Sequence, residues 1–224
     1  MPSHESQAAA GLADQVIAWR RAMHAHPELS GQEEWTAGYV ADRLREFGYH
    51  DVTTRVGGGW GVTTELRVSG ATRTIALRAD MDALPITEET GVEYASRVAG
   101  VMHACGHDCH TAMLLGAAKL LRSRADIVPV NVRFIFQPHE EVYPGGAQGM
   151  IAAGVLDGVS AIFGLHMLLG PGRFIAETAV DTATWLGMVK ADPIVVEADF
   201  ETSETPEAAP APTTAPDRFH EARL

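Results

Sequence analysis

Four short clusters in the sequence contain the residue types that bind metal ions or transfer protons. They are an Asp-Met-Asp run at 80–82, a run rich in His and Cys at 103–108, a His-Glu-Glu run at 139–141, and His166. Thiolate, imidazole and carboxylate groups bind zinc and other first-row divalent metal ions. Such an ion lowers the pKa of a water molecule from about 15.7 to about 7, which makes a nucleophile for amide hydrolysis at neutral pH. The clusters therefore favour a hydrolytic metal site.

The most specific of these clusters is Cys105-Gly106-His107. A thiolate and an imidazole two residues apart, hinged on glycine in a loop, can both turn towards one ion. The adjacent Glu140 and Glu141 offer one carboxylate for the metal and another that takes a proton from water and passes it to the leaving nitrogen. Their spacing alone does not decide which glutamate has which role.

Asp82 and Asp108 suit a supporting position, in which a carboxylate orients an imidazole or another metal ligand. Taken singly, the clusters also have structural interpretations. Asp80 and Asp82 could cap the turn that follows them, and the Glu-Glu pair could be a solvated turn. A single histidine after a strand, such as His166, more often has a structural role than a metal-binding one.

A different chemistry would use Cys105 as a nucleophile and His107 as its base, as cysteine hydrolases do. Under this alternative, a thiol alkylator abolishes activity and a chelator does not. The alternative leaves Glu140, Glu141 and His166 without a role, whereas a metal site uses all of these residues. The metal site is therefore the stronger interpretation.

Three helices are predicted from the spacing of apolar residues. The first covers residues 12–24 and the last covers residues 111–122. The middle helix is opened by Ser30 and Glu33, which have the S-x-x-E spacing of a capping box, and is closed by Gly48.

Short apolar runs bounded by turn residues predict strands. Their ranges are 61–68, 74–78, 130–136 and 161–165, and a turn at 69–70 joins the first two. Helices and strands that alternate in this way favour an α/β sandwich with a mostly parallel central sheet. Ligands of open α/β sheets bind outside the carboxyl ends of the strands, where these polar clusters lie. We therefore expect the fold to bring the clusters together.

The composition narrows the classes of partner and compartment. The chain has 17 basic and 29 acidic residues and no Lys/Arg-rich run, so we expect neither a nucleic-acid partner nor an anionic membrane. No apolar run approaches the roughly 18 residues that cross a bilayer, and the polar start lacks the apolar core of a signal peptide. Cys105 and Cys109 lie four residues apart and form no disulfide framework. We expect a reduced, cytoplasmic protein.

The run MHACGHDCHTAMLLGAA at residues 102–118 resembles the signature of the M20 metallopeptidase family. It is most similar to the branch of hippurate hydrolases, N-acyl-amino-acid amidohydrolases and indole-acetyl-amino-acid hydrolases. Further matches in family order are RRAMHAHPELS at 20–30, ALRADMDALPI at 76–86, FQPHEE at 136–141, GGAQGMI at 145–151 and AIFGLH at 161–166. The resemblance covers residues 12–166 and implies a zinc-exopeptidase-like sandwich.

The resemblance also implies residue roles. Two divalent metal ions (Zn, Mn, Co or Ni) would be bound by Cys105, His107, Glu141 and His166. Glu140 would be the general base and Asp82 would support the site. By analogy the substrate is a small N-acyl amino acid, such as hippurate, which is cleaved to a carboxylate and a free amino acid. His103, Cys109 and His110 lie beside the ligands, and no direct role is assigned to them.

After His166 the sequence departs from the family pattern. We expect residues 1–175 to be the N-terminal part of a catalytic domain that is incomplete at its C-terminus, and residues 176–200 to be a divergent segment. Residues 201–224 are rich in Pro, Ala, Thr and Glu and are predicted to be a disordered tail. The family's dimerisation and lid domain is not recognisable, which leaves the oligomeric state open, and His220 does not match the family's last ligand motif. The alternative function is therefore a metal-binding fragment or binding protein without turnover.

Overall fold

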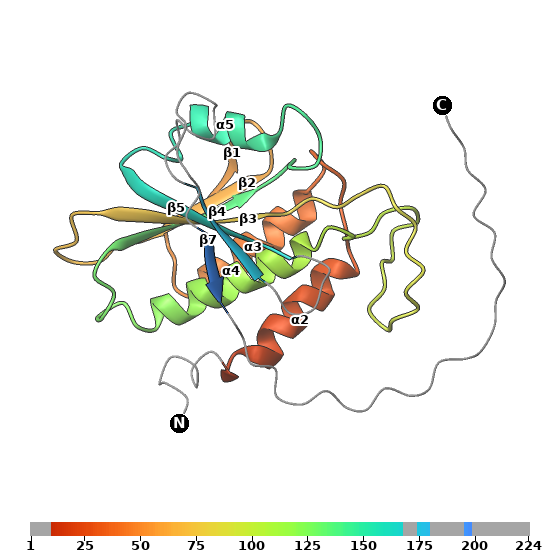
Figure 1. The fold of residues 1–224 in the computed structure, drawn as a ribbon, viewed down its shortest axis with the longest axis horizontal. Helices are drawn as coiled ribbons and strands as arrows, with labels where there is room; N and C mark the ends of the chain where they lie inside the picture. The colour runs from red at the N-terminus through yellow and green to blue at the C-terminus, as the bar shows by residue number, and fades with distance from the viewer. Residues whose placement is uncertain (1–9, 168–173, 180–194, 199–224) are drawn as a thin grey trace.

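The computed structural model describes residues 10–167, 174–179 and 195–198 (Figure 1). The elements are, in chain order, α2 (Ala13–His24), α3 (Glu34–Glu46), β1 (Thr53–Val56), β2 (Gly61–Leu66), β3 (Thr74–Asp80), α4 (His107–Arg122), β4 (Asn131–Gln137), α5 (Gly146–Ala152), β5 (Val159–His166), β6 (Phe174–Ala179) and β7 (Val195–Ala198). Helices and strands alternate from β3 to β5, as the sequence predicts.

The described strands form one sheet in the order β1-β2-β4-β3-β5-β6-β7. At its centre, β3 is parallel to both of its neighbours, β4 and β5. The pairs nearer the two edges are antiparallel. The predicted α/β fold with a parallel central sheet is thus confirmed, and antiparallel strands flank the parallel centre on both sides.

The predicted turn at Ser69 and Gly70 is present, but the strands that it joins lie on either side of β4. Phe134 of β4 faces Thr64 of β2 on one side and Leu77 of β3 on the other. The reason is the apolar character of β4, which is buried over most of its length. A strand that is apolar on both faces needs a central place with both faces covered.

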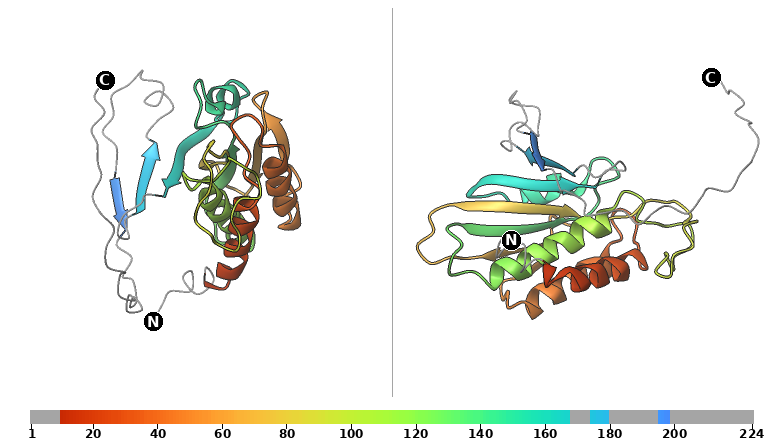
Figure 2. Two further views of the ribbon diagram at one scale, coloured as in Figure 1. Left: turned by 90° about the vertical axis from the view of Figure 1, so that its right-hand side faces the viewer. Right: turned by 60° about the horizontal axis from the view of Figure 1, so that its bottom comes forward.

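Helices α2, α3 and α4 cover one face of the sheet, and α5 lies on the other face (Figures 1 and 2). The larger core lies under the three helices and includes Met23, Leu44, Leu115, Phe134 and Phe136. The smaller core, on the α5 side, is formed by Ala76, Ile135, Met150 and Val155. Both faces of the central strands are therefore buried, which holds their carboxyl ends in a fixed arrangement.

The capping box predicted at Ser30 and Glu33 is wrong. Helix α3 begins at Glu34, and Glu33 precedes it without a side-chain capping bond. Instead, Glu28 accepts hydrogen bonds from the backbone N–H groups of Trp35 (3.0 Å) and Thr36 (2.8 Å), which satisfies the first turn of the helix. Ser30 and Glu33 are therefore free to bind groups far away in the sequence.

The predicted disordered tail at 201–224 and His220 lie outside the described residues, as does most of the segment 176–200. Within the described part of the chain, we find no helix that combines the length and the apolar character needed to cross a membrane.

Candidate metal centre

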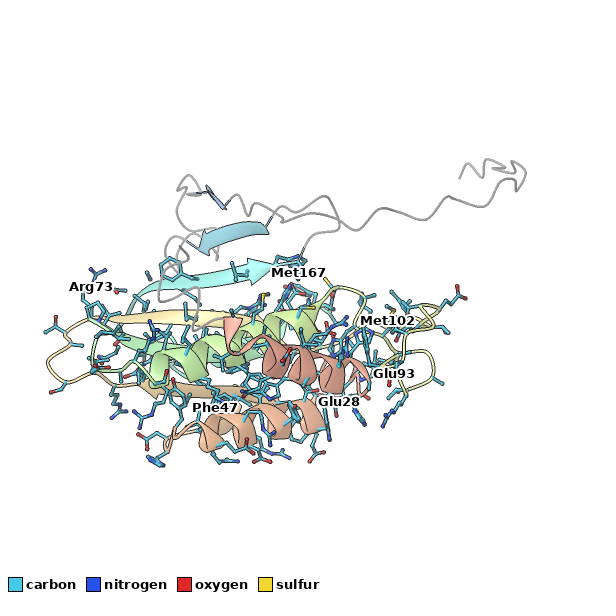
Figure 3. All side chains as sticks on the ribbon, turned by 90° about the horizontal axis from the view of Figure 1, so that it is seen from below. Glu28, Phe47, Arg73, Glu93, Met102 and Met167 are labelled. Atoms are coloured by element: carbon cyan, nitrogen blue, oxygen red, sulfur yellow. The ribbon has the colours of Figure 1, made fainter. Side chains whose placement is uncertain are left out.

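The predicted clusters meet at one end of the sheet because β3, β4 and β5 run parallel there. These strands end at Asp80, Gln137 and His166, and the predicted ligand residues lie at or just after those ends. Figure 3 shows this end by Met167, which follows β5, and the opposite end by Arg73, which precedes β3. The topology thus places the site at the carboxyl ends of the strands, as ligand sites in α/β sheets generally are.

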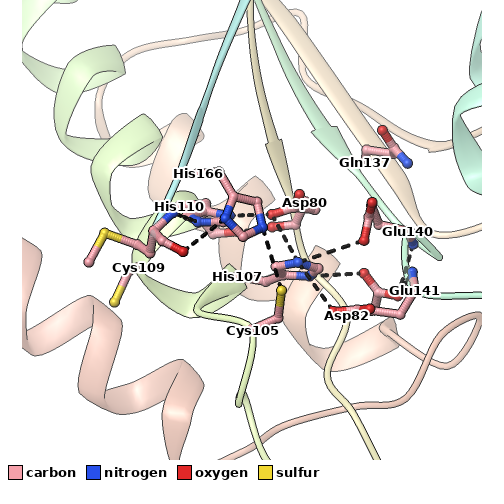
Figure 4. A network of polar contacts seen from close by, with 12 residues as sticks. Asp80, Asp82, Cys105, His107, Cys109, His110, Gln137, Glu140, Glu141 and His166 are labelled. Atoms are coloured by element: carbon pink, nitrogen blue, oxygen red, sulfur yellow. Dashed lines mark hydrogen bonds and ion pairs between the residues drawn. The ribbon is translucent and has the colours of Figure 1, made fainter. Parts of the chain in front are cut away.

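The Cys105-Gly106-His107 turn places the remaining predicted cluster, at residues 103–108, at the same end of the sheet. Gly106 has φ 88°, in the left-handed region that glycine adopts readily. A Cβ atom at this position would lie 3.2 Å from the Cβ atom of Met167. His107 is the first residue of α4, which begins four residues earlier than the predicted start at Thr111. The turn therefore brings the Cys105 thiol and the His107 ring together at the start of the helix (Figure 4).

All four predicted metal ligands gather around His107. The Sγ atom of Cys105 lies 3.5 Å from Nε2 of His166. Ligand atoms of Cys105, His107 and His166 lie within 4.8 Å of one another, and so do those of His107, Glu140 and Glu141. His107 belongs to both groups, so the structure offers two adjacent sets of donors that share one ring.

The orientation of His107 fits a bound cation. Its Nδ1 atom faces Oδ1 of Asp82 at 3.2 Å, so the proton of the neutral ring lies on Nδ1 and Nε2 has a lone pair. Nε2 is 3.5 Å from Oε1 of Glu141, and neither atom has a hydrogen-bond partner among the described residues. Two buried acceptors that face each other repel unless a positive charge lies between them. The residues present therefore fit a divalent metal ion at this position.

Asp82 fixes this arrangement through its hydrogen bonds. Its Oδ2 atom accepts hydrogen bonds from the Ser30 hydroxyl (2.6 Å) and from the backbone N–H groups of Glu140 (2.8 Å) and Glu141 (2.9 Å). Burial would raise the pKa of Asp82, but the hydrogen bonds from His107, the two amides and Ser30 outweigh it and lower the pKa to about 2. An ionised Asp82 thus orients both the His107 ring and the turn that carries the glutamates.

Glu33 supports the same turn from the other side. It is fully buried, and its Oε1 atom accepts hydrogen bonds from the backbone N–H groups of His139 (2.7 Å) and Gly31 (2.9 Å). His139 has φ 55°, a conformation that is uncommon for a residue with a side chain. Three successive N–H groups, at residues 139–141, are therefore bound by two carboxylates. The sequence interpretation missed Glu33, since only the turn geometry shows that role.

The two glutamates differ in environment. Glu141 is the more buried, with 19% of its side chain exposed, whereas 41% of Glu140 is exposed. Burial, the negative charge of Asp80 and that of Glu141 raise the pKa of Glu140, against the opposing effects of His107 and Arg78. A carboxylate with a raised pKa and access to solvent suits proton transfer, and the buried one suits metal binding.

The thiol of Cys105 lies among negative charges. Burial, together with Glu141, Asp80 and Glu140, raises its pKa to about 12. Nucleophilic cysteines have the opposite surroundings, with positive groups that lower the pKa. A divalent cation would instead deprotonate this thiol, because metal ions bind the thiolate form.

A third group of possible metal ligands consists of Asp80, His107 and His110, all buried. Here both ring nitrogens of His110 already have partners. Nδ1 lies 2.6 Å from Oδ1 of Asp80, and Nε2 lies 2.8 Å from the backbone nitrogen of Met167. His110 therefore has no free lone pair for a metal ion.

Asp108 is not in the supporting position that its place in the sequence suggests. Its Oδ2 atom lies 2.7 Å from Nδ1 of His24 and 2.7 Å from Nε of Arg20, so it links α4 to α2. His103 is buried near His24, with ring centroids 6.4 Å apart, and burial lowers its pKa to about 4. These residues form a polar cluster beside the predicted metal ligands rather than among them.

The sequence of this chain is similar to that of known proteins. A family model, Peptidase family M20/M25/M40, matches residues 76–221. The N-acyl-L-amino acid amidohydrolase of Geobacillus stearothermophilus is 51% identical over 152 residues, which are 68% of this chain and 40% of the relative. The N-acetyl-L-cysteine deacetylase of Bacillus subtilis is 46% identical over 155 residues, which are 69% of this chain and 36% of the relative. The chain thus spans about 40% or less of the length of these curated relatives.

A solved structure shows the same fold. It is a Bacillus subtilis protein described as a dinuclear metal binding peptidase from the M20 family, with a TM-score of 0.67 and 45% identity. The match covers 71% of this chain and 44% of that chain. The zinc-exopeptidase-like expectation for the fold is confirmed, and the donor groups around His107 agree with the expected pair of divalent ions. The chain belongs to peptidase family M20/M25/M40.

Proposed function

We propose that the site is a two-metal centre that hydrolyses the amide bond of N-acyl amino acids to a carboxylate and a free amino acid. The ligands are Cys105, His107, Glu141 and His166. The observation that carries the proposal is the pair of buried acceptors, Nε2 of His107 and Oε1 of Glu141, which face each other 3.5 Å apart. The names of the Geobacillus amidohydrolase and the Bacillus deacetylase support the substrate class.

Glu140 is the general base in this proposal. Its Oε2 atom lies 3.8 Å from Nε2 of His107, beside the proposed ligands, and part of its side chain is open to solvent. It takes the proton from the attacking water and passes it to the nitrogen of the breaking amide bond. When bound, divalent ions supply an acidified water and polarise the amide carbonyl.

Asp82 acts through other residues rather than on the substrate. It keeps the proton of His107 on Nδ1, and it accepts the backbone N–H groups of Glu140 and Glu141. One carboxylate therefore fixes a ligand ring and the turn that carries the base. This arrangement gives the preorganisation that a hydrolytic site needs.

A cysteine nucleophile is the weaker alternative for the same residues. Burial and the negative charges around Cys105 raise the pKa of its thiol to about 12, so almost no thiolate forms at neutral pH unless a cation is present. Nε2 of His166 lies 3.5 Å from the sulfur, whereas the alternative uses His107 as the base.

The test is release of free amino acid from hippurate and from N-acetyl amino acids by the purified chain. We expect turnover that a chelator abolishes, that Zn²⁺, Mn²⁺, Co²⁺ or Ni²⁺ restores, and that Glu140→Gln removes without loss of metal. Metal binding without release from any of these substrates would favour a binding protein without turnover. Activity that survives the chelator but is lost on thiol alkylation would favour the cysteine mechanism.

A further inference from the structure

We propose that His110 is a positioning residue that fixes the orientation and tautomer of the ligand His166, acting through the peptide group of Met167. The inference rests on the proposed metal centre, because His166 is one of its ligands. The sequence assigns no role to His110. Both of its ring nitrogens already have hydrogen-bond partners, so it is not itself a ligand in the proposed centre.

The first link is the contact between Asp80 and His110. Nδ1 of His110 lies 2.6 Å from Oδ1 of Asp80, and both side chains are buried. The other oxygen of Asp80 accepts a hydrogen bond from Nη1 of Arg78 at 2.7 Å. A backbone N–H can only donate, and the one at Met167 faces Nε2 of His110, so the ring proton lies on Nδ1, which donates to Asp80.

The second link is the contact between His110 and Met167. With its proton on Nδ1, the neutral ring has a lone pair on Nε2. That atom accepts a hydrogen bond from the backbone N–H of Met167 at 2.8 Å. The Met167 peptide therefore has a fixed place directly after the end of β5.

The third link is the contact between Met167 and His166. The carbonyl oxygen of Met167 lies 2.8 Å from Nδ1 of His166 and accepts a hydrogen bond from it. Nε2 of His166 is then unprotonated and lies 3.5 Å from the Cys105 sulfur, on the side of the proposed ligands. Hydrogen bonds of this kind fix the tautomer and ring direction of metal-binding histidines. The centroids of the two rings, His110 and His166, are 4.9 Å apart (Figure 4). We call this chain of contacts, from Asp80 through His110 and the Met167 peptide to His166, the relay.

The test is a titration of the full chain with Co²⁺, followed by visible absorption and by the charge-transfer band of the cobalt–thiolate bond. The critical variant is His110→Asn, whose amide can still donate to Asp80 but is too short to accept from the Met167 N–H. His110→Gln is its partner, because the longer side chain can place an oxygen near the position of Nε2. His103→Asn is the matched control, since His103 is also buried beside the ligands but its ring nitrogens have no hydrogen-bond partner among the described residues.

We expect His110→Asn to weaken Co²⁺ binding by about 10- to 100-fold, the usual effect of removing a group that orients a metal ligand, and to shift the visible bands. His110→Gln should lie closer to the wild type in both affinity and spectrum. His103→Asn should keep the wild-type spectrum. Circular dichroism confirms that each variant is folded, and if His110→Asn unfolds, the tautomers of His110 and His166 in the wild type are read by ¹⁵N NMR instead.

The relay is overturned if folded His110→Asn binds Co²⁺ like the wild type, if His110→Gln loses as much affinity as His110→Asn, or if the NMR spectra place the His110 proton on Nε2. An equal loss in His103→Asn would also overturn it, because any buried histidine would then have the same effect. Failure of the wild type to form a cobalt–thiolate band is a different result, which contradicts the proposed metal centre itself.

Discussion

Nε2 of His107 and Oε1 of Glu141 lie 3.5 Å apart, and neither atom has a hydrogen-bond partner among the described residues. Burial of two unsatisfied acceptors costs about 1–3 kcal/mol each. The fold maintains this contact because Asp82 fixes both the ring and the turn that carries the glutamate. A cation bound between the two atoms would offset this cost, so in the proposed metal centre the contact links the fold to metal binding.

Glu140→Gln is expected to separate chemistry from binding. The substitution removes a proton acceptor that lies outside the four proposed ligands, so hydrolysis should fall by about 100-fold or more while metal content stays at the wild-type level. Initial rates with hippurate and elemental analysis of the same samples measure the two quantities. A parallel loss of metal would show that Glu140 is a ligand instead.

Asp82→Asn should destabilise the chain and weaken metal binding. The carboxylate of Asp82 accepts four hydrogen bonds, and an amide N–H₂ group must face at least one of those donors. We expect a loss of about 2 kcal/mol or more in unfolding free energy and about 10- to 100-fold weaker metal binding. Urea unfolding and metal titration measure these effects, with the exposed Asp51→Asn as the control. Wild-type behaviour of Asp82→Asn would contradict the assigned role.

The prediction for Glu33 depends on its Oε1 atom, which accepts both of its hydrogen bonds from backbone N–H groups. In Glu33→Gln the amide oxygen can still accept from His139 and Gly31, while the amide nitrogen takes the place of Oε2, which has no hydrogen-bond partner among the described residues. We expect a small change for Glu33→Gln and a loss of about 2 kcal/mol or more for Glu33→Ala. Chemical denaturation of both variants distinguishes them. Equal losses would mean that the negative charge, and not the acceptor, is required.

Much of this site follows from the sequence, because its ligands lie in local patterns. The spacing of Cys105 and His107 and the ends of the predicted strands bring the proposed ligands together once the strands are parallel. The capping box at Ser30 and Glu33 fails because a local motif competes with partners that are distant in the sequence. Glu28 caps the helix, while Ser30 and Glu33 bind Asp82 and the His139 turn, and no local pattern reports those contacts.

The central position of β4 and the contacts of His110 were also beyond local patterns. The strand order depends on how the whole sheet buries Phe134 and Phe136, which is a property of the assembled core. The contacts of His110 depend on a backbone N–H at Met167, and backbone groups have no sequence signature. Both features depend on contacts between residues that are distant in the sequence, so no local pattern predicts them.

The cluster of His24, Asp108 and Glu88 gives a prediction about pH. Both ring nitrogens of His24 face carboxylates, Asp108 at 2.7 Å and Glu88 at 3.2 Å. The hydrogen bond to Asp108, above all, raises the pKa of His24 against the effect of burial. This contribution to stability is present below the unfolded pKa of about 6.5 and is lost as pH rises through the higher folded value.

His24→Asn should therefore destabilise the chain most at mildly acidic pH. We expect a difference from the wild type of about 2 kcal/mol near pH 6, the usual scale of a hydrogen bond to a charged group, and a smaller difference near pH 9. Urea unfolding of both proteins at the two pH values measures it. A difference that grows with pH would contradict a charged His24.

The most direct test of the metal centre is the metal content of the purified, folded chain, measured by elemental analysis beside Cys105→Ala and Glu140→Gln. We expect about two divalent ions per chain in the wild type and in Glu140→Gln, as in two-metal hydrolytic sites, and a sharp fall in Cys105→Ala. Little or no bound metal in the folded wild type, or an unchanged content in Cys105→Ala, would contradict a metal centre built from Cys105, His107, Glu141 and His166.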